Sequence, residues 1–233
     1  MKSKLKTIYT SVDRLFPAIG GLIRRVHLRK PLNSVKRQIS GRQNVIRYGN
    51  SILSSVFVDI KGDRNYIEVQ NGCLLNGVTF FIRGDGHRIE IGKGCSFNRG
   101  GSLWLGDHGC SLIIGEGATF EDVHIAVTEP GSKVEIGEDC QFAYDIDLRT
   151  GDSHSIIDAT SKERLNHAKD IYIGKHVWVA AHSILLKGVS ILEDSVVATG
   201  SVVTKGFEEK GVIIAGNPAK IVRRQISWSR ELV

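Results

Sequence analysis

Residues 175–205 read KHVWVAAHSILLKGVSILEDSVVATGSVVTK, and this stretch decides the fold. A small or apolar residue stands at every sixth place, and an apolar residue follows it two places later. The first set is Val177, Ser183, Val189, Ser195 and Ser201, and the second is Val179, Leu185, Ile191, Val197 and Val203. This period is typical of short stacked strands whose alternate side chains point inward. The stretch predicts an all-β fold, a parallel β-helix.

A longer repeat extends the same pattern upstream. The tetrapeptides are IEVQ (67–70), IEIG (89–92), LIIG (112–115), VEIG (134–137) and IYIG (171–174), and they begin 22, 23, 22 and 37 residues apart. Stacking such coils buries a continuous core that no single coil could bury. The last spacing equals one 22-residue coil plus 15 residues. The pattern therefore predicts a 15-residue inserted loop at 156–170.

Cysteine usage fits the same register. Cys73, Cys95 and Cys140 occupy equivalent inward positions in their coils, so we interpret them as core residues and not as a redox pair. No CxxC pair occurs, and a cysteine zinc site is therefore unsupported.

The charge of the chain is concentrated near its start. Residues 1–42 carry 11 Lys or Arg against Asp13 alone, which gives +10 and leaves −4 for the rest of a chain whose net charge is +6. The larger part thus lacks the basic face that nucleic-acid binding requires. The sequence has no run of 18 apolar residues and no secretory signal pattern, which predicts a cytoplasmic protein.

The N-terminal segment has apolar residues at helical spacing, flanked by Lys and Arg. We expect a basic amphipathic helical arm over 1–44, a β-helix domain over 45–207 and a C-terminal tail over 208–233. The arm has two open interpretations. It caps the first coil or assembles subunits, or it makes a peripheral contact with anionic lipid.

Three motifs add a functional signal. They are RTGDSHSI (149–156), IYIGKHVWVAAHSILLKGVSI (171–191), and SVVTKGF (201–207) with AGNPAKIVRR (215–224). With them the sequence resembles the hexapeptide-repeat acyltransferases, which have a left-handed β-helix and generally form trimers with active sites between subunits. The DSH and VW spacing is similar to that of capsule polysaccharide O-acetyltransferases. The resemblance implies an acetyl-CoA-dependent O-acetyltransferase acting on a sugar hydroxyl of a bacterial surface polysaccharide or its precursor.

The reaction needs a base, because a sugar hydroxyl is a poor nucleophile toward a thioester near neutral pH. Histidine titrates in the range that lets it accept this proton. The resemblance places the catalytic histidine at His154, directly before the predicted loop, and Asp152 or Asp147 could orient its ring. It also places Trp178 beside this histidine, as a wall of the acceptor pocket. Asp147, Arg149, Arg164 and Asn166 are the candidate acceptor-binding residues.

The resemblance also implies a donor site for acetyl-CoA. Ala181 and Thr199 would present main-chain groups along the pantetheine arm, and Thr204 and Lys205 would meet the adenosine end. Arg223 and Arg224 are candidates for the 3′-phosphate. Ala180 stands where the family more often has Gly, and Ala181 where Ser is common.

Other functions remain as alternatives. An N-acetyltransferase of an amino sugar would use the same donor and a similar histidine, and a non-catalytic structural β-helix would make His154 incidental. A zinc site of His154, His176 and His182 is disfavoured. His176 and His182 lie six residues apart, on successive faces of a coil, so no metal is expected.

Overall fold

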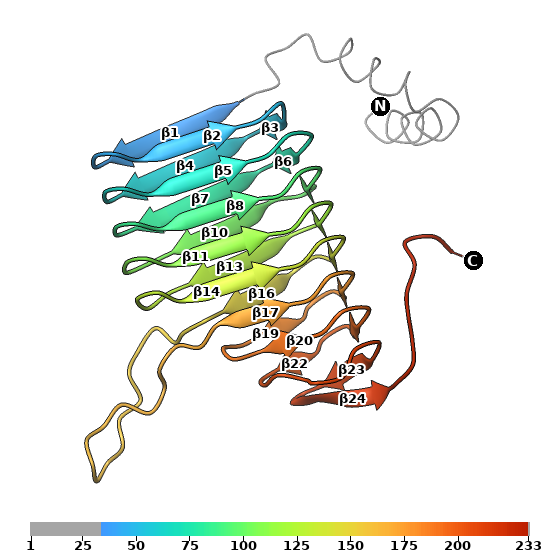
Figure 1. Ribbon diagram of the computed structural model, residues 1–233. Coiled ribbons are helices and arrows are strands. Elements are labelled where there is room, and N and C mark those ends of the chain that lie inside the picture. The colour runs from blue at the N-terminus through green and yellow to red at the C-terminus, as the bar shows by residue number, and fades with distance from the viewer. Residues whose placement is uncertain (1–33, 233) are drawn as a thin grey trace. The chain divides into compact units, whose positions relative to one another are not determined.

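The computed structural model describes residues 34–232, which form 24 strands wound into stacked coils (Figure 1). Each coil contributes one strand to each of three sheets, and each strand pairs in parallel with its equivalent in the next coil. The exception in the described residues is the antiparallel pair β23 and β24 at the C-terminal end. The three sheets enclose a single core, which makes the fold a parallel β-helix.

The first sheet contains β1 (Val35–Ser40), β4 (Val56–Lys61), β7 (Val78–Arg83), β10 (Gly101–Leu105), β13 (Val123–Val127), β16 (Ile146–Arg149), β19 (Ile184–Leu185) and β22 (Val202–Val203). The second contains β2 (Val45–Tyr48), β5 (Tyr66–Val69), β8 (Arg88–Ile91), β11 (Ser111–Ile114), β14 (Lys133–Ile136), β17 (Ile171–Ile173) and β20 (Ser190–Ile191). The third contains β3 (Ile52–Ser54), β6 (Leu74–Asn76), β9 (Ser96–Phe97), β12 (Thr119–Phe120), β15 (Gln141–Phe142), β18 (Trp178–Val179), β21 (Val196–Val197), β23 (Ile213–Gly216) and β24 (Ala219–Arg223).

Alternation within the strands builds the core from columns of equivalent side chains. In the third sheet Phe97, Phe120 and Phe142 are buried and stack face to face, with ring centroids 4.4 and 4.8 Å apart. All four cysteines are buried and unpaired with one another. Burial raises the pKa of the Cys140 thiol to about 12, so it stays protonated as a core residue.

Buried serines replace apolar residues in the C-terminal coils without leaving their hydroxyls unsatisfied. The Ser183 hydroxyl donates to the Ala180 carbonyl at 2.7 Å, and the Ser201 hydroxyl donates to the Ala198 carbonyl at 2.6 Å. A buried hydroxyl without a partner would cost about 1–3 kcal/mol. The small side chain and its local hydrogen bond therefore suit the tight corner between the third and first sheets.

A polar ladder closes the corner between the first and second sheets in the N-terminal coils. The Asn44 side-chain oxygen accepts the Asn65 N–H at 2.9 Å, and the Asn65 oxygen accepts the His87 N–H at 2.9 Å. His87 continues the series, since its Nδ1 accepts the Cys110 N–H at 3.1 Å. That bond assigns the ring proton to Nε2, which lies 3.2 Å from the Arg83 carbonyl. The buried imidazole is thus held in one neutral tautomer.

The long spacing in the repeat has a direct structural explanation. Val134 pairs with Ile171 in the register of neighbouring coils, so the extra residues between them leave the coil and return to it. The β-helix boundaries differ from those expected. It begins at Val35 and not at residue 45, because 35–40 pair with β4, and it continues past residue 207 through β23 and β24. The predicted arm lies outside the described residues over 1–33. The described residues contain no apolar helix of membrane-spanning length.

We predict that His87→Asn reduces the loss of stability in mild acid. Burial lowers the pKa of His87 below its usual 6.5. The unfolded chain then binds a proton that the folded chain resists, so this contribution is complete above pH 6.5 and is lost as the pH falls through the lower folded pKa. Asparagine would keep the ladder bonds that Asn44 and Asn65 make.

The measurement is the urea midpoint of unfolding at several pH values from about 7 down to 5. The matched control is His108→Asn, which removes an exposed histidine from the same corner. An acid-dependent fall as steep in His87→Asn as in the unaltered protein would contradict the assignment.

Candidate active site

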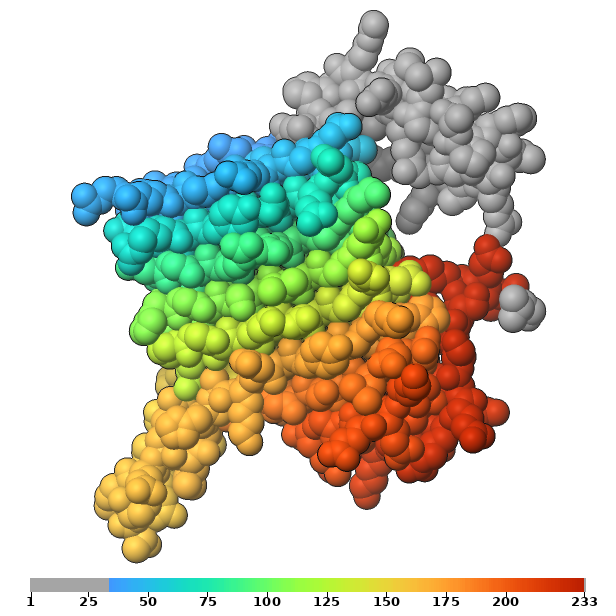
Figure 2. Space-filling view, in the orientation of Figure 1, coloured from blue at the N-terminus to red at the C-terminus, as the bar shows by residue number. Residues whose placement is uncertain are grey.

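The inserted segment leaves the coils after β16, at the corner between the first and second sheets. It stands out from the surface and returns to β17 (Figures 1 and 2). Its two arms are antiparallel, with a bridge between Ile157 and Arg164 and a 2.8 Å hydrogen bond from Leu165 N to Ile156 O. The apolar side chains of Ile156, Ile157 and Leu165 are exposed on it. His154 lies just before the outgoing arm.

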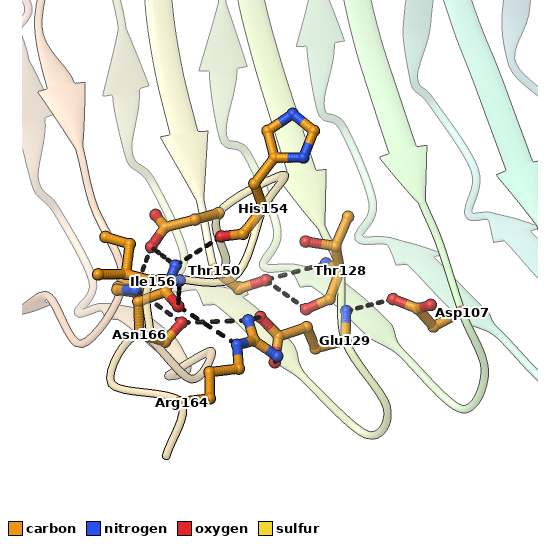
Figure 3. A network of polar contacts seen from close by, with 10 residues as sticks. Asp107, Thr128, Glu129, Thr150, His154, Ile156, Arg164 and Asn166 are labelled. Atoms are coloured by element: carbon orange, nitrogen blue, oxygen red, sulfur yellow. Dashed lines mark hydrogen bonds and ion pairs between the residues drawn. The ribbon is translucent and has the colours of Figure 1, made fainter. Parts of the chain in front are cut away.

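Asn166 is the centre of the polar network that anchors this segment (Figure 3). Its buried side-chain N–H group donates to Asp152 Oδ2 at 2.7 Å and to the His154 carbonyl at 2.8 Å. Its oxygen accepts the Ile156 N–H at 2.6 Å. One side chain therefore holds the backbone at His154 and Ile156 together with the carboxylate of Asp152.

Two ion pairs reinforce the network. Lys187, one coil further along, approaches Asp152 Oδ2 at 2.5 Å and donates to the Asn166 carbonyl at 3.0 Å. Arg164 forms two bonds to the Glu129 carboxylate, at 2.5 and 3.0 Å. Hydrogen bonds from Lys187 and then Asn166 lower the pKa of Asp152, and the bond from Arg164 lowers that of Glu129. Both carboxylates are therefore ionised near neutral pH.

The His154 imidazole is exposed and points away from this network (Figure 3). Among the described residues, neither of the predicted acidic partners touches its ring. Asp152 is occupied by Lys187 and Asn166, and Asp147 Oδ2 accepts from Arg149 Nε at 2.7 Å. The chain thus fixes the His154 backbone and leaves both ring nitrogens available.

Trp178 lies elsewhere, on the outer surface of the third sheet. Its side chain is 37% exposed, and its ring centroid is 6.0 Å from that of Trp228 in the C-terminal segment. Trp228 in turn stacks on His176 at 4.3 Å and donates its indole N–H to the His176 carbonyl. The third sheet is opposite the corner that carries His154, so one chain does not bring His154 and Trp178 together.

The residues predicted to bind acetyl-CoA also lie on different sides of the chain. Ala181 and Thr199 stack at the corner between the third and first sheets, where Gly200 N donates to the Ala181 carbonyl at 2.9 Å. Thr204 and Lys205 follow β22 at the corner shared with His154. Arg223 ends β24, and Arg224 is held by Glu209 through bonds of 2.6 and 3.0 Å.

The candidate residues therefore form two groups on one chain. One group, at the corner between the first and second sheets, contains His154, Asp152, Arg164 and Asn166, with Thr204 and Lys205 further along. The other contains Trp178, Ala181 and Thr199. Sequence reasoning missed Lys187, Glu129 and Trp228. Lys187 and Glu129 could have been found by aligning equivalent corners of successive coils, whereas nothing in the repeat pattern indicated Trp228.

No group of three or more His, Cys, Asp or Glu side chains within residues 34–232 is arranged to hold a metal ion. The two other histidines of the rejected zinc site have separate carboxylate partners. His176 Nδ1 lies 2.8 Å from Asp194, and His182 Nδ1 lies 2.6 Å from Asp145.

The parallel β-helix is the fold of the β-helix acetyltransferases, and comparison with known proteins agrees. The solved structure of the polysialic-acid-specific acetyltransferase NeuO is 34% identical, with a TM-score of 0.77 over 87% of this chain and 91% of that one. The polysialic acid O-acetyltransferase OatWY is 31% identical, with a TM-score of 0.79 over 84% and 92%. No protein-family model matches the chain.

Curated sequences give the same answer over a shorter range. A polysialic acid O-acetyltransferase of Escherichia coli O1:K1 is 39% identical over 52% of this chain, and one of Neisseria meningitidis is 34% identical over 53%. These alignments cover 39% and 57% of the two relatives, less than two thirds of either. The chain belongs to the hexapeptide-repeat O-acetyltransferase family that includes the polysialic acid O-acetyltransferases.

We predict that Asn166→Ala loosens the inserted segment without unfolding the β-helix. The variant loses four side-chain hydrogen bonds at a buried site, and groups left without a partner there cost about 1–3 kcal/mol. Hydrogen exchange should therefore quicken at backbone amides of residues 155–166, whereas the urea midpoint of the β-helix should move little. Asn76→Ala removes a bond between coils far from this corner and is the control. Unchanged exchange in the segment would contradict the role given to Asn166.

Proposed function

We propose that the chain transfers the acetyl group of acetyl-CoA to a hydroxyl of a bacterial polysaccharide of the polysialic acid type. The observation that carries the proposal is the combination of two facts. The chain resembles polysialic acid O-acetyltransferases along most of its length, and its corner histidine is exposed on a backbone that Asn166 holds in place. In this proposal His154 is the general base.

The chemistry then runs in one direct transfer. The His154 imidazole accepts the proton of the sugar hydroxyl as the hydroxyl oxygen attacks the thioester carbonyl carbon. A C–O bond forms, the C–S bond breaks, and the imidazolium returns the proton to the departing thiolate of coenzyme A. Asp152 is the better placed of the two predicted acidic partners, because it shares the Asn166 amide with the His154 carbonyl.

The acceptor-binding roles need refinement. Arg164 and Asn166 are occupied by bonds within the chain, so we assign them to holding the inserted segment. Arg149 keeps N–H groups beyond the one that meets Asp147, and it is the candidate for contact with an acceptor hydroxyl or carboxylate.

We further propose a homotrimer whose active sites lie between copies. Since His154 and Trp178 occupy opposite sides of one chain, a site that uses both needs His154 from one copy and Trp178 from its neighbour. Ring-shaped assemblies repeat one such contact by rotation. The exposed apolar side chains of the inserted segment would then face the neighbouring copy.

Acetyl-CoA would lie in the same cleft between copies. Backbone groups at Ala181 and Thr199 would bind the pantetheine arm, and Thr204 and Lys205 would approach the adenosine end. Arg223 is exposed and available to a phosphate, whereas Arg224 would first have to leave Glu209. Because acetyl-CoA is the donor in this proposal, we also propose that the reaction takes place in the cytoplasm, and the arm predicted over 1–44 stays the candidate for peripheral membrane contact.

We predict that His154→Ala lowers acceptor-stimulated thiol release from acetyl-CoA by roughly 10²–10⁴-fold, the range of general base catalysis. The assay compares polysialic acid with a panel of other bacterial polysaccharides. His108→Ala removes an exposed histidine from the same corner two coils earlier and should retain full activity. Failure of every glycan to raise release above that of His154→Ala would overturn the proposed function.

Mixing two inactive variants tests the shared site. His154→Ala and Trp178→Ala subunits, unfolded and reassembled together at equal amounts, should regain activity in about one site in four by random assembly. Each variant reassembled alone should stay inactive. No recovery in a mixture of confirmed trimers would overturn the site shared between copies.

A further inference from the structure

The outer surface of the first sheet has a hollow beside the proposed active site. Trp104, Ala126 and Arg149 are outward-facing neighbours in register on β10, β13 and β16. Ala126 carries only a methyl group between two large side chains. Trp104 and Arg149 are two strands apart, about 10 Å at the usual strand spacing, so they form facing walls over the Ala126 floor.

The hollow is continuous with the segment that carries His154. It has a volume of about 310 Å³. Its lining includes Arg83, Trp104, Ala126 and Arg149 on the sheet, together with Asp152 and Ser153. Because the last two directly precede His154, a ligand in the hollow would extend toward the proposed base.

The walls are fixed before any ligand arrives. Arg83 is paired with Asp59 at 2.6 Å, and its guanidinium lies 3.6 Å from the centre of the Phe81 ring. Phe81 meets Trp104 edge to face, with centroids 6.2 Å apart. Such contacts restrict the Trp104 ring to one orientation, which reduces the entropy lost on binding.

The Trp104 wall also carries an unsatisfied donor. The Trp104 indole nitrogen is buried and has no hydrogen-bond partner within residues 34–232. Buried donors in folded proteins normally have a partner, and each exception calls for an explanation.

We propose that this hollow is an acceptor subsite that binds one sugar unit of the polysaccharide, next to the unit being acetylated. The inference rests on the proposed function, and it adds Trp104 and Ala126 to the residues that select the acceptor. The Trp104 ring packs on the apolar face of the sugar. Arg149 binds a hydroxyl or carboxylate from the opposite wall.

Steady-state kinetics of thiol release test the subsite, with polysialic acid as the acceptor. Trp104→Ala removes one wall and Ala126→Leu fills the floor, and each should raise the KM for polysialic acid about tenfold. The KM for acetyl-CoA should stay unchanged, because the donor does not contact this hollow, whereas partial unfolding would lower the maximal rate and leave both KM values unchanged. Trp104→Phe should retain much of the affinity. Tyr172→Ala, which removes an exposed aromatic from the second sheet, is the matched control.

Two further measurements separate the subsite from the reaction. Calorimetric binding of polysialic acid without acetyl-CoA should weaken in Trp104→Ala but not in His154→Ala. If binding weakens only in Trp104→Ala but no acetyl transfer is detected, the subsite proposal stands and the proposed function is overturned. Active Trp104→Ala and Ala126→Leu with unchanged KM would overturn the subsite. A loss of sedimentation mass in either variant would assign the hollow to subunit contact and would also overturn it.

Discussion

The parallel hydrogen-bonded register between successive coils is the constraint on which the rest of the structure depends. Once Val134 pairs with Ile171 and Ile173 with Ile191, every inward side chain lies against its equivalent in the neighbouring coil. The Phe97, Phe120 and Phe142 stack and the Asn44, Asn65 and His87 ladder are both consequences of this register. A slip of one residue would turn each buried column outward, so burial and register enforce each other.

The same constraint decides where function can be added. A coil cannot lengthen within a strand without losing its pairing, but a corner can accept extra residues if the chain returns in register. The insertion before Ile171 does this, and a network centred on Asn166 ties its two ends to the coils. Side chains at outward positions do not pack in the core, so their size can vary. Trp104, Ala126 and Arg149 therefore form a hollow on strands whose other faces are fully buried.

The sequence was sufficient to predict the coils, because each inward position repeats. Three motifs then indicated the family. It was insufficient where contacts have no periodicity. The pairing of residues 35–40 with β4 lacks the tetrapeptide signal, and β23 and β24 follow the last hexapeptide. Lys187 meets Asp152 across a coil, a contact visible only after alignment by register. The separation of His154 from Trp178 likewise depends on which sheet each strand joins, since they are 24 residues apart in sequence and 15 of these belong to the inserted loop.

The C-terminal segment introduces a different kind of contact. In a solenoid each coil touches only its neighbours, so the end coils can in principle peel away one at a time. Arg230 bonds to Asp139 and Thr119, 91 and 111 residues earlier, and Trp228 is stacked on His176. The C-terminal segment around Trp228 and Arg230 therefore cross-links several coils. Unfolding that starts at the C-terminal coils must first break these contacts, which raises the barrier to unfolding. The C-terminal half of the β-helix therefore opens as a cooperative unit.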